Sequence, residues 1–215
     1  MIIVNFKTYK ESTGQNALKL AKKIEIAAIK SKIPVILSVP TLYLKEIKEE
    51  VSIPVYAQHA DLEGYGGHTG KILLENLKDM GITGTLLNHS EYQINEEQIK
   101  ETITKAKKLG IKIILCANTP AKAKKLSKLK PDFIAIEPPE LIGGTISVST
   151  AKPEVITNTV KNVDVPVLCG AGIHTTKDVE IALKLGAKGI LLASGVVLSQ
   201  NPGKEIWELA KGFKY

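Results

Sequence analysis

Residues Phe133 to Val148 read FIAIEPPELIGGTISV, and the rest of the chain can be organised around this stretch. The apolar run from Phe133 to Ile136 is typical of a fully buried strand, and it ends in a single acid, Glu137. The residue before a proline disfavours the helical region, so Pro138 predicts that Glu137 stays extended at the strand's tip. A strand-end carboxylate next to a proline-stiffened, glycine-containing loop is typical of a base with a lid. A solvated acid before an ordinary turn is the alternative.

Apolar runs like this one recur along the whole chain and alternate with amphipathic, lysine-rich segments. The runs are continuous rather than alternating, which is typical of parallel strands covered on their outer face. Together with Phe133–Ile136 there are eight: Ile2–Val4, Val35–Val39, Val55–Ala57, Thr85–Leu87, Ile113–Cys116, Val165–Cys169 and Gly189–Ala193. Helical periodicity is clearest over residues 16–29, 94–109 and 178–185.

Glycine and proline punctuate the expected helices. Gly110 and Gly186 fall just after a helical pattern, where a left-handed cap is favoured, and Pro120, Pro153 and Pro202 fall near helix starts. Eight strand–helix units with no linker-like change of composition predict an α/β fold: a single (β/α)8 barrel over residues 1–215, in a short version. A doubly wound open sheet is the alternative.

Composition narrows the class of protein. The 215 residues fit one large domain or two small ones, and 44% of them are apolar, which is enough for a substantial core. No apolar run reaches the roughly 18 residues of a membrane span, and the N-terminus lacks the features of a signal peptide. Cys116 and Cys169 lie in apolar runs, which favours buried reduced thiols and a cytoplasmic location.

The charge of the chain is unusual in its type. The net charge is +7, and all 29 basic residues are lysine. Arginine is the main residue for reading guanine edges and for forked phosphate contacts, so its absence argues against a nucleic-acid partner. Any phosphate site must therefore use backbone amides or a lysine.

A barrel predicts reactive residues at the carboxyl ends of its strands. The residues found there are Asn5 and Lys7, His59, Asn88 and His89, Glu137, Gly170-Ala171-Gly172 and Ala193-Ser194-Gly195. The last two turns follow the seventh and eighth strands, where barrels commonly bind phosphate. Gly170 and Gly172 would let amides approach an anion, Ser194 adds a hydroxyl, and Gly195 would open a short helix. Purely structural turns are the alternative.

Three polar residues near the strand ends have competing interpretations. Lys7 should lie at the rim, facing either solvent or an anionic ligand, and Asn5 has the same strand parity. His89 could be a packing histidine. If it is functional, helix-type N–H groups after it should keep the ring neutral and able to donate a hydrogen bond. No histidines and acids recur at metal-ligand spacing, so we expect no metal.

Five motifs make the chain resemble the triosephosphate isomerase family, in the short form typical of archaea. They are Asn5-Phe6-Lys7, Asn88-His89-Ser90-Glu91, Ile136-Glu137-Pro138-Pro139, Gly170-Ala171-Gly172 and Ala193-Ser194-Gly195. The resemblance implies a TIM barrel that interconverts dihydroxyacetone phosphate and glyceraldehyde 3-phosphate, in glycolysis and gluconeogenesis, without a cofactor. It also implies that Glu137 is the base and that neutral His89 polarises the carbonyl. Lys7 then supplies positive charge, and Asn5 positions the same oxygens.

The resemblance implies further contacts. Substrate and phosphate would be held by Phe6, Ile142, Gly143, Gly172, Ala193 and Ser194. Glu91 corresponds to the acid that orients the lysine. Thr69 corresponds to the residue that reaches into a neighbouring subunit, which implies a homo-oligomer. The resemblance to the short form implies a tetramer. Phe6 replaces the family's usual tryptophan, and Tyr92 stands where many members have arginine.

Other functions remain open to the sequence. Related phosphate-binding barrels, including other sugar-phosphate isomerases, share the turns after strands seven and eight but lack this pairing of histidine and glutamate. A non-catalytic phospho-ligand-binding barrel would bind triose phosphates without turnover. An RNA-binding protein would lose affinity steeply with salt, and the scattered lysines argue against it.

Overall fold

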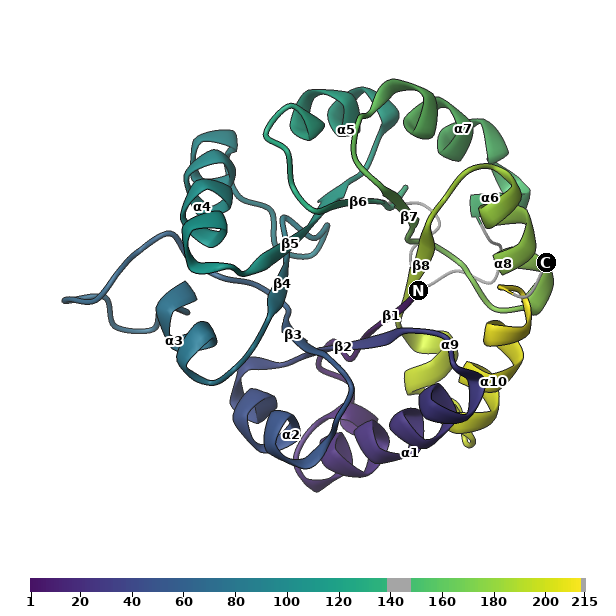
Figure 1. Cartoon of the computed structure of the whole chain (residues 1–215), viewed down its shortest axis with the longest axis horizontal. Helices are drawn as coiled ribbons and strands as arrows, with labels where there is room; N and C mark the ends of the chain where they lie inside the picture. Colours follow the sequence, from purple (N-terminus) through teal and green to yellow (C-terminus); the bar gives the residue numbers. More distant parts are fainter. Residues whose placement is uncertain (139–147, 214–215) are drawn as a thin grey trace.

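The strands close into a barrel in which every neighbouring pair is parallel and the order around the barrel is the order along the chain (Figure 1). The computed structural model describes residues 1–138 and 148–213. The strands are β1 (Ile2–Asn5), β2 (Val35–Val39), β3 (Val55–Ala57), β4 (Gly84–Leu87), β5 (Lys112–Ala117), β6 (Phe133–Ile136), β7 (Val167–Cys169) and β8 (Gly189–Leu192). The predicted (β/α)8 barrel is therefore confirmed, and the open sheet was wrong.

Helices form a ring around the outside of the barrel (Figure 1). They are α1 (Gln15–Ser31), α2 (Leu44–Glu50), α3 (Leu74–Asp79), α4 (Glu96–Leu109), α5 (Pro120–Ser127), α6 (Val148–Ala151), α7 (Pro153–Asn162), α8 (Thr176–Lys184), α9 (Ser194–Val197) and α10 (Pro202–Lys211), with short 3-10 turns η1 (Lys10–Ser12) and η2 (Thr41–Tyr43). Among the described helices none is long and apolar enough to cross a membrane.

The strands are apolar on both faces because each face meets a separate core. Ile3, Leu86 and Leu168 belong to the core inside the barrel. Their neighbours along the strands, such as Val4 and Leu87, pack in the larger core between the barrel and the helices. Alternate side chains of a strand point to opposite faces, so a strand with two buried faces reads as one continuous apolar run.

The predicted helix signals act as expected. Gly110 ends α4 with φ of 75°, and Gly186 follows α8 with φ of 101°, both left-handed values that favour glycine. Pro120, Pro153 and Pro202 each occupy the first turn of a helix, where no hydrogen bond from the proline nitrogen is needed. The seventh strand begins at Val167 rather than at the predicted Val165.

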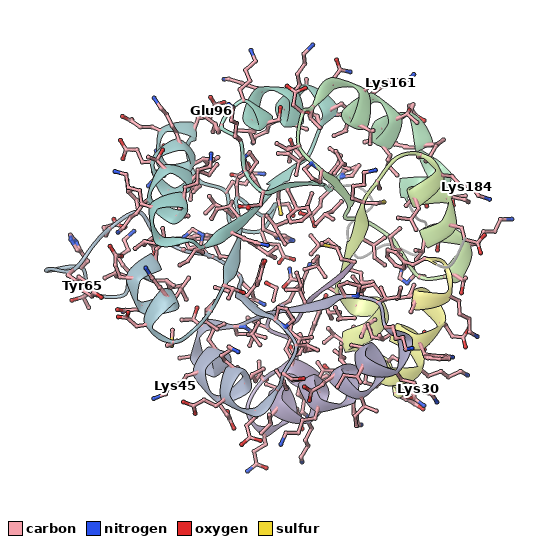
Figure 2. The ribbon with its side chains drawn as sticks, in the orientation of Figure 1. Lys30, Lys45, Tyr65, Glu96, Lys161 and Lys184 are labelled. Carbon is pink, nitrogen blue, oxygen red and sulfur yellow. The ribbon has the colours of Figure 1, made fainter. Side chains whose placement is uncertain are left out.

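The lysines cover the outer surface. Lys30, Lys45, Lys161 and Lys184 are exposed and point outward from four different helices of the ring (Figure 2). The basic charge is thus spread around the barrel, as expected for solvated helix faces.

The longest described connection projects from the barrel between β3 and α3, with Tyr65 near its tip (Figure 2). Its base is tied down by Lys105 of α4, whose Nζ donates to the carbonyl oxygens of Leu62 and Glu63 at 3.2 and 2.6 Å. The same ammonium group lies 2.9 Å from Glu75 Oε1. The outer part, residues 65–70, is exposed.

Candidate active site

One pocket at the carboxyl ends of the strands brings together most of the residues predicted from the sequence. Its lining includes Asn5, Lys7, His89, Glu137, Gly172, Ala193 and Ser194. These residues lie at or just after the ends of β1, β4, β6, β7 and β8, so the pocket forms only when the barrel closes. Ile142 and Gly143 lie outside the described residues. Thr69 is exposed on the projecting loop, away from this pocket.

Glu137 follows β6 directly and is only 4% exposed, which excludes a solvated surface acid. Its backbone N–H donates to Ala117 O at 2.9 Å, which continues the hydrogen-bonded pairing of β5 and β6. Oε1 lies 3.5 Å from His89 Nε2, and Oε2 is buried without a hydrogen-bond partner among the described residues. A buried carboxylate oxygen without a hydrogen-bond donor costs free energy. A ligand that donates a hydrogen bond to this oxygen would remove part of that cost.

Gly170 makes room for that carboxylate. A Cβ atom there would lie 2.4 Å from Glu137 Cγ, closer than real Cβ contacts allow. The Gly170 N–H donates to Ile136 O at 3.0 Å. The N–H of Gly170 is therefore already used within the barrel, and its missing side chain leaves space for Glu137; that the turn lets other amides approach an anion stays a prediction.

His89 is held with a defined hydrogen-bonding pattern. The backbone N–H of Glu91 donates to its Nδ1 at 3.2 Å. An acceptor at Nδ1 places the proton of a neutral ring on Nε2, the atom that faces Glu137. Burial lowers the pKa of His89, but the hydrogen bond and charge of Glu137, with the charge of Glu91, outweigh it, so the pKa is raised from 6.5. The backbone thus favours the neutral ring that we expected, and the carboxylates oppose it.

Lys7 reaches the pocket through a left-handed turn. Its φ is 46°, and β1 ends at Asn5, so the strand-parity argument for Asn5 and Lys7 was wrong even though both line the pocket. The Lys7 side chain is 13% exposed, and its Nζ lies 2.6 Å from Glu91 Oε1. Asn5 Oδ1 accepts the Lys7 N–H at 3.0 Å, which holds the turn.

Two neighbours of these residues were not singled out from the sequence. Gln58 follows β3, and its Nε2 donates to Asn5 Oδ1 at 3.0 Å and to Lys7 O at 3.2 Å. Cys116 and Glu137 both line a small cavity, and burial and that carboxylate raise the pKa of Cys116 well above its ordinary value. The order of strands would have pointed to Gln58, because it stands at the end of the third strand.

Phe6 is not a ligand contact. Its side chain is fully buried in the core between barrel and helices. Its N–H donates to Ser38 O at 2.9 Å, and its carbonyl oxygen accepts from Ser12 Oγ at 2.6 Å. We correct the expectation that Phe6 binds substrate, because its side chain and both its backbone groups are already used in packing the turn before Lys7.

The turns after β7 and β8 form the opposite side of the pocket. Gly172 has φ of 65°, a left-handed value that favours glycine. Helix α9 begins at Ser194, one residue earlier than expected, with Ala193 preceding it. Both turns carry small residues, an arrangement that suits an anion bound by backbone N–H groups.

A groove of about 250 Å³ adjoins the pocket on the side of β2 to β4. Its lining includes Lys7, Gln58, His89, Glu91 and Tyr92. In residues 1–138 and 148–213, no group of three or more histidine, cysteine, aspartate or glutamate side chains is arranged to hold a metal ion. Cys116 and Cys169 are both free and buried.

The chain is similar to known proteins over nearly its whole length. The model of the family described as "Triosephosphate isomerase" matches residues 1–210. A triosephosphate isomerase from Methanocaldococcus jannaschii is 48% identical over 216 residues, covering 98% of this chain and 99% of the relative. Those from Methanothermus fervidus and Archaeoglobus fulgidus are 47% and 45% identical, each covering 97% of this chain and 96% of the relative. The chain therefore belongs to the triosephosphate isomerase family.

Proposed function

We propose that this chain interconverts dihydroxyacetone phosphate and D-glyceraldehyde 3-phosphate by proton transfer through an enediolate, with Glu137 as base and His89 as electrophile. Family membership supports the reaction, which belongs to glycolysis and gluconeogenesis and needs no cofactor. The observation that carries the residue roles is the pairing of Glu137 Oε1 with His89 Nε2 at 3.5 Å inside a buried pocket.

Glu137 removes a proton from the carbon next to the substrate carbonyl and returns it to the neighbouring carbon. Its buried Oε2, which has no hydrogen-bond partner among the described residues, supports this role because the atom is available to the substrate proton. His89 donates the Nε2 proton toward the carbonyl oxygen and stabilises the charge that develops there. The Glu91 N–H on Nδ1 supports that direction of donation.

Lys7 supplies positive charge beside the enediolate and the phosphate, and Asn5 positions the same oxygens. The ion pair with Glu91 supports an orienting role for that acid. Gly172, Ala193 and Ser194 hold the phosphate with backbone N–H groups, because a chain without arginine has no forked side-chain donor for it. Ile142 and Gly143 would add contacts from the lid.

We propose that the protein is a homo-oligomer in which the projecting loop of one copy, with Thr69, enters the groove of another. The support is the groove beside Lys7 and His89, the loop's exposed outer part, and two exposed apolar side chains, Leu42 and Tyr92. A tetramer is the proposed state, by likeness to short archaeal forms. Sedimentation of the wild type beside Tyr92→Lys checks this, and a fully active monomeric wild type would refute it.

The chain is proposed to act as one domain over residues 1–215 and to work in the cytoplasm, which its two buried free thiols favour. A non-catalytic phospho-ligand-binding barrel and another sugar-phosphate isomerase are the competing functions. Isomerisation of glyceraldehyde 3-phosphate by the wild type, with a metal chelator present, is measured beside Glu137→Gln. Turnover that Glu137→Gln loses supports the proposal, whereas a folded wild type without turnover contradicts it.

A further inference from the structure

Asn88 stands out by its backbone conformation and its burial. It lies between the end of β4 and His89, its φ is 59°, and it is 3% exposed. Asparagine is one of the few residues other than glycine that adopts this left-handed conformation at modest cost. The turn directs the chain out of the barrel wall immediately before His89.

Both ends of the Asn88 side-chain amide are used. Nδ2 donates to the carbonyl oxygen of Cys116 at 3.0 Å, and Oδ1 accepts the N–H of Ile94 at 3.2 Å. The last paired residues of β4 and β5 are Leu87 and Leu115, so the amide ties the two strands together one residue beyond their last pair. A single buried side chain therefore anchors both the start and the end of the loop 88–94.

The anchored loop is the one that determines the state of His89. Within it, Glu91 N–H donates to His89 Nδ1, and Tyr92 N–H donates to His89 O at 2.8 Å. The Glu91 N–H can stay on Nδ1 only while the loop keeps its shape, and this contact is what leaves the proton on Nε2. Cys116, whose carbonyl oxygen accepts the hydrogen bond from Asn88, also interacts with Glu137 through its thiol.

We propose that Asn88 is a positioning residue for the isomerisation: by closing the loop 88–94 onto β5, it keeps the Nε2-protonated tautomer of His89 aimed at the substrate carbonyl. This inference rests on the proposed function. The competing interpretation is that Asn88 only fills a left-handed position that glycine would fill equally well.

Asn88→Gly separates the two interpretations, because it preserves the backbone freedom and removes both hydrogen bonds. Positioning errors of about 1 Å can cost about 100-fold in rate, so we expect kcat to fall by about 10- to 100-fold while KM changes less than about threefold. The same substitution in a His89→Gln background should lower kcat less than about threefold, since the residue through which Asn88 acts is already gone.

The outcomes that overturn the proposal are defined by the same four proteins. One is a folded Asn88→Gly variant whose kcat stays within about twofold of the wild-type kcat. That result would show that the left-handed turn alone, which glycine preserves, is enough for catalysis. The other is an equal loss of kcat in both backgrounds, the additive behaviour of independent sites. If Asn88→Gly unfolds at the assay temperature, Asn88→Asp is judged by the same criteria: it keeps the shape and the acceptor to Ile94, but replaces the donor to Cys116 with an acceptor that carries a charge when ionised.

Two measurements separate positioning from stability and from a wrong function. Asn201→Ala removes a capping asparagine whose Oδ1 accepts from Lys204 N at 3.1 Å outside the pocket, and it should lower Tm but not kcat. Imidazole ¹⁵N shifts, assigned to His89 by comparison with His89→Gln, should change from one tautomer to a mixture in Asn88→Gly. Unchanged shifts overturn the proposal. A wild type that does not isomerise glyceraldehyde 3-phosphate refutes the proposed function instead. The imidazole ¹⁵N shifts then still show whether Asn88 sets the tautomer of His89.

Discussion

The two sides of the pocket differ in what they present to a ligand: long side chains on one side and small residues with their backbone on the other. On the side of β1, β4 and β6, the groups that line the pocket are side-chain ends, from Lys7, His89 and Glu137. His89 and Glu137 are buried against each other, and Lys7 is paired with Glu91. On the side of β7 and β8, the lining consists mainly of small residues such as Gly172, Ala193 and Ser194, which carry short side chains or none.

This difference predicts opposite rules for substitution. A side chain that polarises or ionises cannot be replaced by another of similar size, because its chemistry is lost. A backbone N–H is common to every residue except proline, so the side chain on that side matters only through the space it takes. Substitutions on the side of β1, β4 and β6 should therefore lower kcat. Those on the side of β7 and β8 should raise KM or act through steric clashes of the new side chain.

After the loss of turnover expected for Glu137→Gln, the largest effect is expected for His89→Gln. Removing one donor to a developing oxyanion typically costs about 10²- to 10³-fold in kcat, and we expect a loss in that range with a small change in KM. Steady-state kinetics on the purified variant, with circular dichroism to show that it is folded, measures this. A loss smaller than about threefold would place the carbonyl-polarising group elsewhere.

Lys7→Ala should lower kcat by about 10²-fold and also raise KM, because one ammonium group faces both the enediolate and the phosphate. Glu91→Gln is the matched control: it keeps Lys7 charged but removes the partner of the 2.6 Å ion pair. We expect its loss in kcat/KM to be smaller than that of Lys7→Ala. Equal losses would show that orientation, and not charge, is the main contribution of Lys7.

Gly170→Ala tests the boundary between the two sides. The added methyl group would collide with Glu137 Cγ, so a substitution on the backbone side should damage the side-chain side and lower kcat by about 10- to 100-fold. Gly110→Ala is a useful comparison, because a Cβ there meets no atom within 4 Å and only the left-handed backbone is strained. Gly110→Ala should lower Tm and leave kcat unchanged; a normal kcat in Gly170→Ala would show that Glu137 can move aside.

The pKa of His89 should fall when Glu137 is replaced by glutamine. Burial and Lys7 lower this pKa, and Glu137 and Glu91 raise it, so removing the Glu137 charge leaves the lowering causes less opposed. Titration of the imidazole by NMR in wild type and Glu137→Gln measures the direction. A pKa that rises in the variant would contradict the balance of charges described here.

The smallest effect is expected for Ser194→Ala. If the backbone N–H holds the phosphate, only the hydroxyl contact is lost, which is worth about 0.5–1.5 kcal/mol or roughly 2- to 10-fold in KM. The kcat should not change. A loss of kcat comparable to that of Lys7→Ala would mean that the hydroxyl does chemistry and would remove the distinction between the two sides.

Much of the site could be predicted because the barrel converts sequence order into position. Once eight apolar runs are recognised, every residue just after a run is assigned to one end of the barrel, which brought Lys7, His89 and Glu137 together. The errors came from details that strand order does not contain. Phe6 was assigned to substrate through its neighbours in a motif, yet the left-handed turn at Lys7 leaves it in the core.

By itself, the sequence determined the barrel, its helix ends and the candidate base, because continuous apolar runs, left-handed glycines and a proline after Glu137 act through local physics. Only the tertiary structure decided what each group is bonded to. The Lys7–Glu91 pair spans 84 residues, and the Asn88–Cys116 bond spans 28. Such contacts depend on distances set by the closure of all eight strands, and no local pattern encodes them. For the same reason, only the tertiary structure shows that Gly170 lacks a side chain where Glu137 needs the space.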